Sequence, residues 1–232
     1  VDLRPATIRD WLLAGAEPPP AAAATLVSVV GEIRDAETGL ALPARIYVRS
    51  ATGTWHFPQT ASTAGSAIRY ERQRPNTGAI EMHTTLSAHP FRVELAPGRY
   101  TFTVERGKEY RPETREVVVA RDTPRQTFRL HRWVDMAKSG WFSGDTHVHR
   151  DSRDFANVML AEDVNVVLPM VDWTTESHVS PRASAKSASG DLGGRAVTVD
   201  ATHVWYPRNT EYEIFRTENR SLQLGAFLIV NH

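Results

Sequence analysis

The feature that most restricts the fold is a succession of short strand-like segments, separated by turns, between residues 25 and 132. The clearest segments cover 27–34, 44–49, 91–95, 99–105, 114–119 and 126–130. Several alternate apolar and polar residues, which places the apolar side chains on one face of a strand. Short strands with so many turns favour two packed antiparallel sheets. We therefore predict an antiparallel β-sandwich over residues 25–133.

Residues 1–24 differ in character from the segments that follow. Apolar residues within 2–15 have the spacing of a short amphipathic helix, and 17–24 is rich in proline and alanine, which is typical of a stiff linker. The sequence opens on Val1 without a methionine, which indicates a processed or trimmed product and favours a periplasmic or secreted protein.

Two parts of the predicted sandwich do not follow its strand pattern. The segment 51–88 is a long polar insertion, and we expect His56 and His83 in it, and His89 just after it, to be surface residues rather than a second metal site. The segment 106–112 joins two strands, either as a plain hairpin loop or as a loop that leans over a neighbouring site. The plain hairpin is the expectation.

A second kind of pattern begins with the strand-like segment 141–149, which ends in His147-Val148-His149. Residues two apart on a strand point to the same side, so His147 and His149 can present two imidazoles to one metal ion. Nine histidines in 232 residues give roughly 0.35 such pairs by chance, so the pair alone is weak evidence. The prediction of a metal site therefore depends on the residues around the pair.

The residues after the histidine pair favour a parallel β/α arrangement. Apolar residues in 151–163 have helical spacing, with Asp151 or Asp154 as N-cap. The segment 164–171 is almost continuously apolar, as in a buried parallel strand, although Pro169 disfavours the middle of a central strand. Strand, helix and strand in this order form a βαβ unit with parallel strands.

Polar residues follow the ends of three predicted strands in this part. His147 and His149 close the first strand, Asp172 follows the second, and His232 comes just after an apolar run at 224–230. In (β/α) barrels the active residues gather at the carboxyl ends of the strands. We predict a metal site formed by these four residues.

Two glutamates form a further candidate pair. Glu211 and Glu213 lie on one face of an extended segment, 209–215. That segment is either an edge strand with a solvated acidic face, or it supplies a carboxylate that bridges metals or acts as general base. The pattern does not choose between the two glutamates.

Composition limits the ligands and the partners. There is no cysteine, so His, Asp and Glu must hold any metal, and zinc, manganese and iron all accept such ligands. Lys plus Arg and Asp plus Glu number 27 each, which gives no indication of a nucleic-acid partner. No apolar run approaches the ~20 residues of a membrane span.

Two family resemblances refine these expectations. Val30-Gly31, Asp35, Thr38-Gly39 and Leu95-Ala96-Pro97-Gly98 resemble the carboxypeptidase-regulatory-like (transthyretin-like) β-sandwich family, which implies an accessory module. Gly144-Asp145-Thr146-His147-Val148-His149 resembles the first motif of the PHP (polymerase and histidinol phosphatase) superfamily. With Trp141, Ala161-Glu162-Asp163 and Asn209-Thr210-Glu211-Tyr212-Glu213 added, the resemblance is nearest to its carbaryl-hydrolase-like branch. That resemblance implies a metal-dependent hydrolase on a distorted (β/α)7 barrel.

The PHP resemblance also assigns roles to residues. It implies His147 and His149 as ligands, Asp145 as a partner of an imidazole, and a glutamate ligand at Glu211 or Glu213. Its second motif falls on Val171-Asp172-Trp173, where tryptophan replaces the usual histidine. A further histidine has no clean match, and His203 or His232 is the substitute.

The residues after His149 are fewer than a whole barrel of about 200–250 residues needs. We therefore expect 134–232 to be the N-terminal, incomplete portion of the barrel domain. The expected partners are a small-molecule substrate and either the remainder of the same polypeptide or a second copy. The alternative is a non-catalytic binding or surface module, in which the β-sandwich binds and the barrel portion is scaffold.

Overall fold

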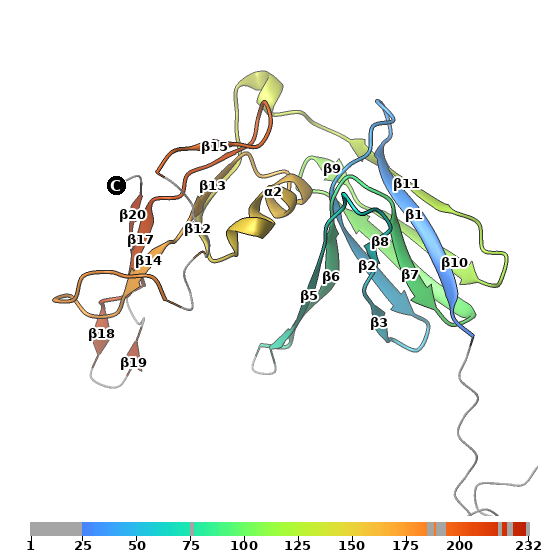
Figure 1. Cartoon of the computed structure of the whole chain (residues 1–232), viewed down its shortest axis with the longest axis horizontal. Coiled ribbons are helices and arrows are strands. Elements are labelled where there is room, and N and C mark those ends of the chain that lie inside the picture. Colours follow the sequence, from blue (N-terminus) through green and yellow to red (C-terminus); the bar gives the residue numbers. More distant parts are fainter. Residues whose placement is uncertain are drawn as a thin grey trace, which may run out of the picture.

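The computed structural model describes residues 25–74, 77–184, 188, 194–217, 220–221 and 225–230. The expected helix and linker at 1–24 lie outside the described residues. The described chain forms a β-sandwich followed by an α/β unit, and helix α2 lies between them (Figure 1). No helix in this part of the chain is long and apolar enough to span a membrane.

The first sheet of the sandwich has the strand order β4-β7-β1-β11-β9. Its strands are β4 (Gln59–Thr60), β7 (Phe91–Leu95), β1 (Val27–Asp35), β11 (Gln126–Arg132) and β9 (Tyr110–Arg111). Strands β1 and β11 pair in parallel, which differs from the wholly antiparallel prediction. The chain passes through the other sheet between these two strands, so no short turn forces them to run in opposite directions.

The second sheet has the order β10-β8-β2-β6-β5, with β3 also paired to β2. Its strands are β10 (Glu113–Val119), β8 (Gly98–Glu105), β2 (Ala44–Ser50), β6 (Ala79–Leu86), β5 (Ala67–Arg74) and β3 (Trp55–His56). All of its recorded pairings are antiparallel, as predicted.

The core of the sandwich lies between the two sheets. Alternate residues of β2, β7 and β8 are buried, which confirms the two-residue period in the sequence. Phe91, Phe102 and Phe128 are fully buried, and the rings of Phe102 and Phe128 stack with centroids 6.0 Å apart. Gly31 is required here, because a Cβ at this position would lie 2.4 Å from Cζ of Phe91.

The polar segment 51–88, for which the sequence predicted no strands, contains β3 to β6. Strands β5 and β6 make a long hairpin that extends the second sheet. His83 on β6 is only 5% exposed, so the expectation of a surface residue was wrong for it. The rings of Tyr47 and Tyr70 lie beside it, with centroids 5.4 and 5.3 Å from the His83 ring, and helix α2 packs on β2 and β6 nearby.

The α/β unit begins with the predicted βαβ arrangement. Strand β12 (Gly144–Val148) leads to helix α2 (Ser152–Ala161) and then to β13 (Val166–Pro169), and β12 and β13 are parallel. Asp151 is the N-cap of α2, and its carboxylate accepts a hydrogen bond from the Arg153 amide. Phe155 and Met159 of α2 pack against Val167 and Trp205 on the sheet.

The remaining strands form separate sheets. The order β12-β13-β16-β15 includes β16 (Val204–Trp205) and β15 (Val197–Thr198), and a second sheet, β14-β17-β20, contains β14 (Asp172–Thr174), β17 (Asn209–Tyr212) and β20 (Phe227–Val230). Strands β18 (Arg216–Thr217) and β19 (Arg220–Ser221) form a small hairpin, and η1 (Ala137–Ser139) is a 3₁₀ turn between the two units. The sheets of the described residues do not close into a barrel.

Two details of these sheets bear on the prediction from strand ends. Pro169 ends β13, because a proline has no N–H to donate, and the chain resumes pairing at Asp172 in the other sheet. Strand β20 runs antiparallel to β17, so its carboxyl end pairs with Asn209 at the start of β17. The expectation of three strands that end at the same edge is therefore wrong for β20.

Charged residues join the two units. Arg106 Nη2 lies 2.7 Å from Asp163 Oδ1, and Arg132 Nη2 lies 2.9 Å from Asp163 Oδ2. Arg45 Nε lies 3.2 Å from Glu162 Oε1. The segment 106–112 is thus both the hairpin connection from β8 to β10 and a contact with the α/β unit, at Gly107 and Arg106.

Candidate metal centre

The two histidines predicted as ligands lie side by side at the end of β12. Their Nε2 atoms are 3.0 Å apart, and their ring centroids are separated by 4.9 Å. The pairing of β12 with β13 shifts register between Asp145 and Val148, as at a β-bulge. Bulges redirect side chains at strand ends, and here both imidazoles remain partly exposed.

Glu211 comes from the other sheet and meets both imidazoles. Its Oε1 lies 3.1 Å from His147 Nε2, and its Oε2 lies 3.1 Å from His149 Nε2. It stands on β17, opposite Trp173 of β14, and is only 1% exposed. The solvated edge strand considered for this segment is wrong for Glu211, because β17 lies between β14 and β20.

These three residues have the chemistry of a metal site. In a tetrahedral site with bonds of 2.0–2.1 Å, ligand atoms lie about 3.3 Å apart, close to the 3.0 and 3.1 Å between the donor atoms here. Two imidazoles and one carboxylate suit zinc, manganese or iron(II). Among the described residues this is the only group of three such side chains with ligand atoms within 4.8 Å of one another.

Asp145 contacts the centre through the backbone. Its Oδ1 accepts a hydrogen bond of 3.0 Å from the His147 amide N–H, and it bonds to no imidazole in the part of the chain that the structure describes. This differs from the expected role as a partner of an imidazole. A short aspartate side chain commonly reaches the amide two residues on, and here that bond holds the backbone at the bulge.

The other predicted site residues lie apart from this group. Asp172 begins β14, opposite Thr210, and Glu213 is buried just beyond β17; neither joins the three-residue cluster. His203 is buried elsewhere, with Nδ1 2.8 Å from Asp200 Oδ1 and Nε2 3.8 Å from Asp163 Oδ1. His232 lies outside the described residues.

The residues that hold the start of β12 were missed from the sequence. The Ser143 amide donates to Asn165 Oδ1 at 2.9 Å, and the Ser143 hydroxyl donates to the Asp163 carbonyl at 3.1 Å. Asp163 has a left-handed backbone, with φ of 52°, and its carboxylate binds two arginines of the sandwich. No local sequence pattern identifies such a network, because its members are brought together by the packing of the two units.

Two titratable side chains next to α2 have displaced pKa values. Burial raises the pKa of Glu162, with Arg45 beside it acting in the opposite direction. Burial lowers the pKa of His83, although the neighbouring Glu81 carboxylate at 2.7 Å opposes the shift. Both shifts reflect the cost of placing charge in the interface between the two units.

The sequence matches no protein-family model, and it shows no significant similarity to a curated protein.

Proposed function

We propose that the protein is a metal-dependent hydrolase, acting on a small-molecule phosphoester, ester or carbamate. The observation that carries the proposal is the convergence of His147, His149 and Glu211 from two different sheets onto one point. Glu211 is nearly completely buried, and a carboxylate placed there is favoured when a cation balances its charge. The three residues would hold that cation.

The protein groups have distinct tasks in this proposal. Neutral imidazoles at His147 and His149 offer their Nε2 lone pairs, and Glu211 supplies negative charge from the closed side of the site. The side chain of His147 is 42% exposed and that of His149 28%, so a small substrate reaches the centre from their side. Asp145 fixes the backbone that carries His147. A bound divalent metal would act as a Lewis acid and activate a water molecule for attack.

The sequence resemblance supports the same reaction class. Gly144-Asp145-Thr146-His147-Val148-His149 is similar to the first PHP motif, and the strand–helix–strand order after it matches the start of a β/α domain. We propose accordingly that the α/β unit is of the PHP type, nearest its carbaryl-hydrolase-like branch, with the β-sandwich as an accessory module.

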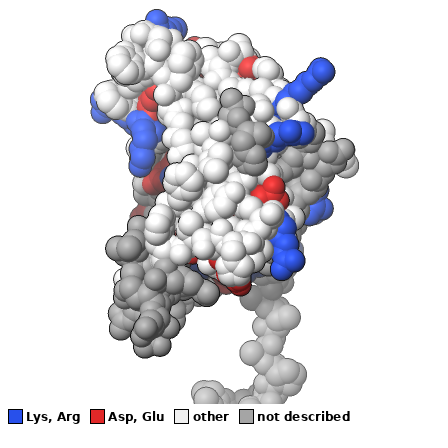
Figure 2. Space-filling view, turned by 90° about the vertical axis from the view of Figure 1, so that its left-hand side faces the viewer, with Lys and Arg blue, Asp and Glu red and all other residues white. Residues whose placement is uncertain are grey.

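Charged side chains of one sign do not gather on the side of the α/β unit that is visible in Figure 2. Figure 2 shows the side on which β17 and β20 lie, and there acidic and basic side chains are scattered among many uncharged ones. The described residues of that side present no continuous basic area of the kind that nucleic acids bind.

Metal content and hydrolysis test the proposal directly. Purified protein is stripped with a chelator, reloaded with zinc, manganese or iron(II), and assayed by elemental analysis and by release of 4-nitrophenol from a phosphate, an acetate and a methylcarbamate ester. We expect one or more metal ions per chain. In His147→Ala and Glu211→Gln, metal affinity should fall by more than the about 10- to 100-fold that follows loss of an outer partner.

The matched control is His178→Ala, which removes an exposed histidine whose Nε2 lies 3.4 Å from Glu176. It should leave metal content and hydrolysis unchanged. Absence of stoichiometric metal from the reloaded protein would overturn the proposal. Stoichiometric metal without hydrolysis of any of the three esters would leave a metal-binding protein and overturn the hydrolase assignment.

A further inference from the structure

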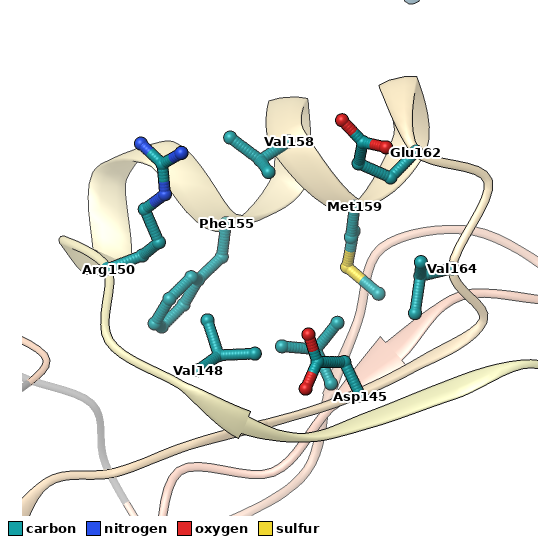
Figure 3. Close-up of a pocket in the computed structure, with 9 residues that line it drawn as sticks. Asp145, Val148, Arg150, Phe155, Val158, Met159, Glu162 and Val164 are labelled. Carbon is teal, nitrogen blue, oxygen red and sulfur yellow. The ribbon is translucent and has the colours of Figure 1, made fainter. Parts of the chain in front are cut away.

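A cavity of about 220 Å³ lies between helix α2 and strands β12 and β13. Figure 3 shows Phe155 and Met159 pointing from the helix toward the strand, with Val148 and Asp145 opposite them. Phe155 and Met159 are both 2% exposed. The helix side of the cavity is therefore a fixed apolar surface, and the carboxylate of Asp145, an exposed residue, stands opposite it.

Asp145 is the charged lining residue that stands opposite helix α2. Two other charged residues line its rim, but both are engaged with the sandwich. The Arg150 guanidinium lies over the Tyr70 ring at 5.0 Å, and Glu162 lies 3.2 Å from Arg45. In Figure 3 their charged ends are at the level of the helix, on the side away from Asp145.

We infer that this cavity is a binding site for a small apolar ammonium ion, such as an arylalkylamine. The ligand's ring or branched chain would contact Phe155 and Met159, and its ammonium group would donate to the Asp145 carboxylate. An ammonium group adds a Coulomb attraction to the carboxylate that a neutral alcohol lacks, so the carboxylate selects amines over alcohols. The apolar contact with Phe155 and Met159 and the bond to the Asp145 carboxylate together define the ligand class.

The size of the cavity restricts the ligand further. An apolar cavity of about 150 Å³ is large enough to hold benzene, so about 220 Å³ accommodates one ring with a short side chain. The helix side of the cavity is held in place by the sandwich, since Asn157 Nδ2 donates to the Thr85 carbonyl at 3.3 Å. The site thus fits molecules of the size of benzylamine.

This site is adjacent to the candidate metal centre but does not depend on it. Asp145 points toward Met159 in Figure 3, and its link to the centre is the hydrogen bond from the His147 amide. A bound ammonium ion would therefore share the Asp145 carboxylate with the backbone amide of His147, one of the proposed metal ligands. The amine site can therefore be tested with metal absent.

Binding is measured by calorimetry and by saturation-transfer NMR on the full chain in the presence of a chelator. The probes are benzylamine, benzyl alcohol and benzoate. We expect benzylamine to bind with a dissociation constant of about 1 mM, typical of so small a ligand. Benzyl alcohol should bind about tenfold more weakly, and benzoate should not bind.

Three variants locate the site. Asp145→Asn should weaken benzylamine about tenfold and leave benzyl alcohol unchanged. Val164→Phe, which fills the end of the cavity opposite Phe155, should abolish binding of both probes. The control Glu116→Gln removes an exposed carboxylate of β10 and should change neither. Circular dichroism confirms that each variant is folded.

Several results would overturn the inference. Equal affinity for benzylamine and benzyl alcohol would remove the role of Asp145, and benzylamine binding that survives Val164→Phe would place the ligand elsewhere. Loss of benzylamine binding in His147→Ala, measured with the chelator present, would indicate that the amine binds at the histidines and not in the cavity. Retention there supports the cavity, whatever the outcome of the metal and hydrolysis assays.

Discussion

Replacing Asp163 by asparagine tests how firmly the two units are joined. The Asp163 side chain is 6% exposed and binds Arg106, which is 7% exposed, at 2.7 Å and Arg132 at 2.9 Å. Asparagine keeps the shape and tolerates the left-handed backbone at φ 52°, so the change isolates the charge. An uncompensated buried charge costs about 3–5 kcal/mol. We expect the free energy of unfolding to fall by about 3 kcal/mol, since Arg132 is partly solvated.

Urea unfolding, followed by tryptophan fluorescence and circular dichroism, measures this loss. A loss of about 3 kcal/mol corresponds to a fall in the midpoint of about 1 M urea. The matched control is Asp135→Asn, whose carboxylate lies 3.1 Å from the exposed Lys138. Surface pairs of this kind contribute up to about 1 kcal/mol, so its unfolding curve should shift little.

A loss below about 1 kcal/mol for Asp163→Asn would refute the reasoning. So would an equal loss in the Asp135→Asn control, because the effect would then not come from burial. If the two probes cease to coincide in Asp163→Asn, the sandwich and the α/β unit have become separate unfolding units. That outcome would confirm that the Asp163 cluster couples them.

Two further predictions concern the same interface. Burial lowers the pKa of His83 below its unfolded value of about 6.5, so the unfolded chain binds more protons as the pH falls through 6.5. The free energy of unfolding is therefore highest above pH 6.5 and declines below it, by at most about 1.4 kcal/mol per pH unit. In urea unfolding at pH 7 and pH 5, His83→Gln should reduce this decline. The control His178→Gln should retain it. Gly107→Ala should destabilise by about 2 kcal/mol or more in thermal melts, because φ is +48° and the new Cβ would lie 2.5 Å from the Glu162 carbonyl oxygen. Gly39→Ala, at φ +71° with nothing within 4 Å, should cost only the backbone strain, and equal losses would exclude a packing role for Gly107.

Local patterns predicted the elements around the metal centre well. The helix at Ser152–Ala161, its N-cap at Asp151 and the parallel pairing of β12 with β13 all depend on residues close together in sequence. The His147-x-His149 spacing likewise predicted two adjacent imidazoles, and these do lie side by side. All of these features lie within the continuous segment from Gly144 to Pro169.

The features that the sequence did not predict depend on packing between segments far apart in the chain. Strands β5 and β6 were missed because their residues are largely polar, and the burial of His83, Thr84 and Thr85 on β6 comes from packing that their sequence does not show. Asp172 was predicted as a ligand from a strand end, but the chain leaves that sheet after Pro169 and joins another. The choice of Glu211 over Glu213 likewise required the register of β17 against β14. These features depend on which strands pair in which sheet, and a short stretch of sequence does not determine that.

Helix α2 is covered on both sides, by the sheet of its own unit through Phe155 and by the sandwich through Asn157 and Glu162. Because α2 contacts both units, we expect the two units to evolve together. A substitution on the outer side of the helix must be matched by one on β2 or β6. Recombination that exchanged the sandwich for another module would also have to rewrite the helix, so the two units are expected to be inherited as a pair.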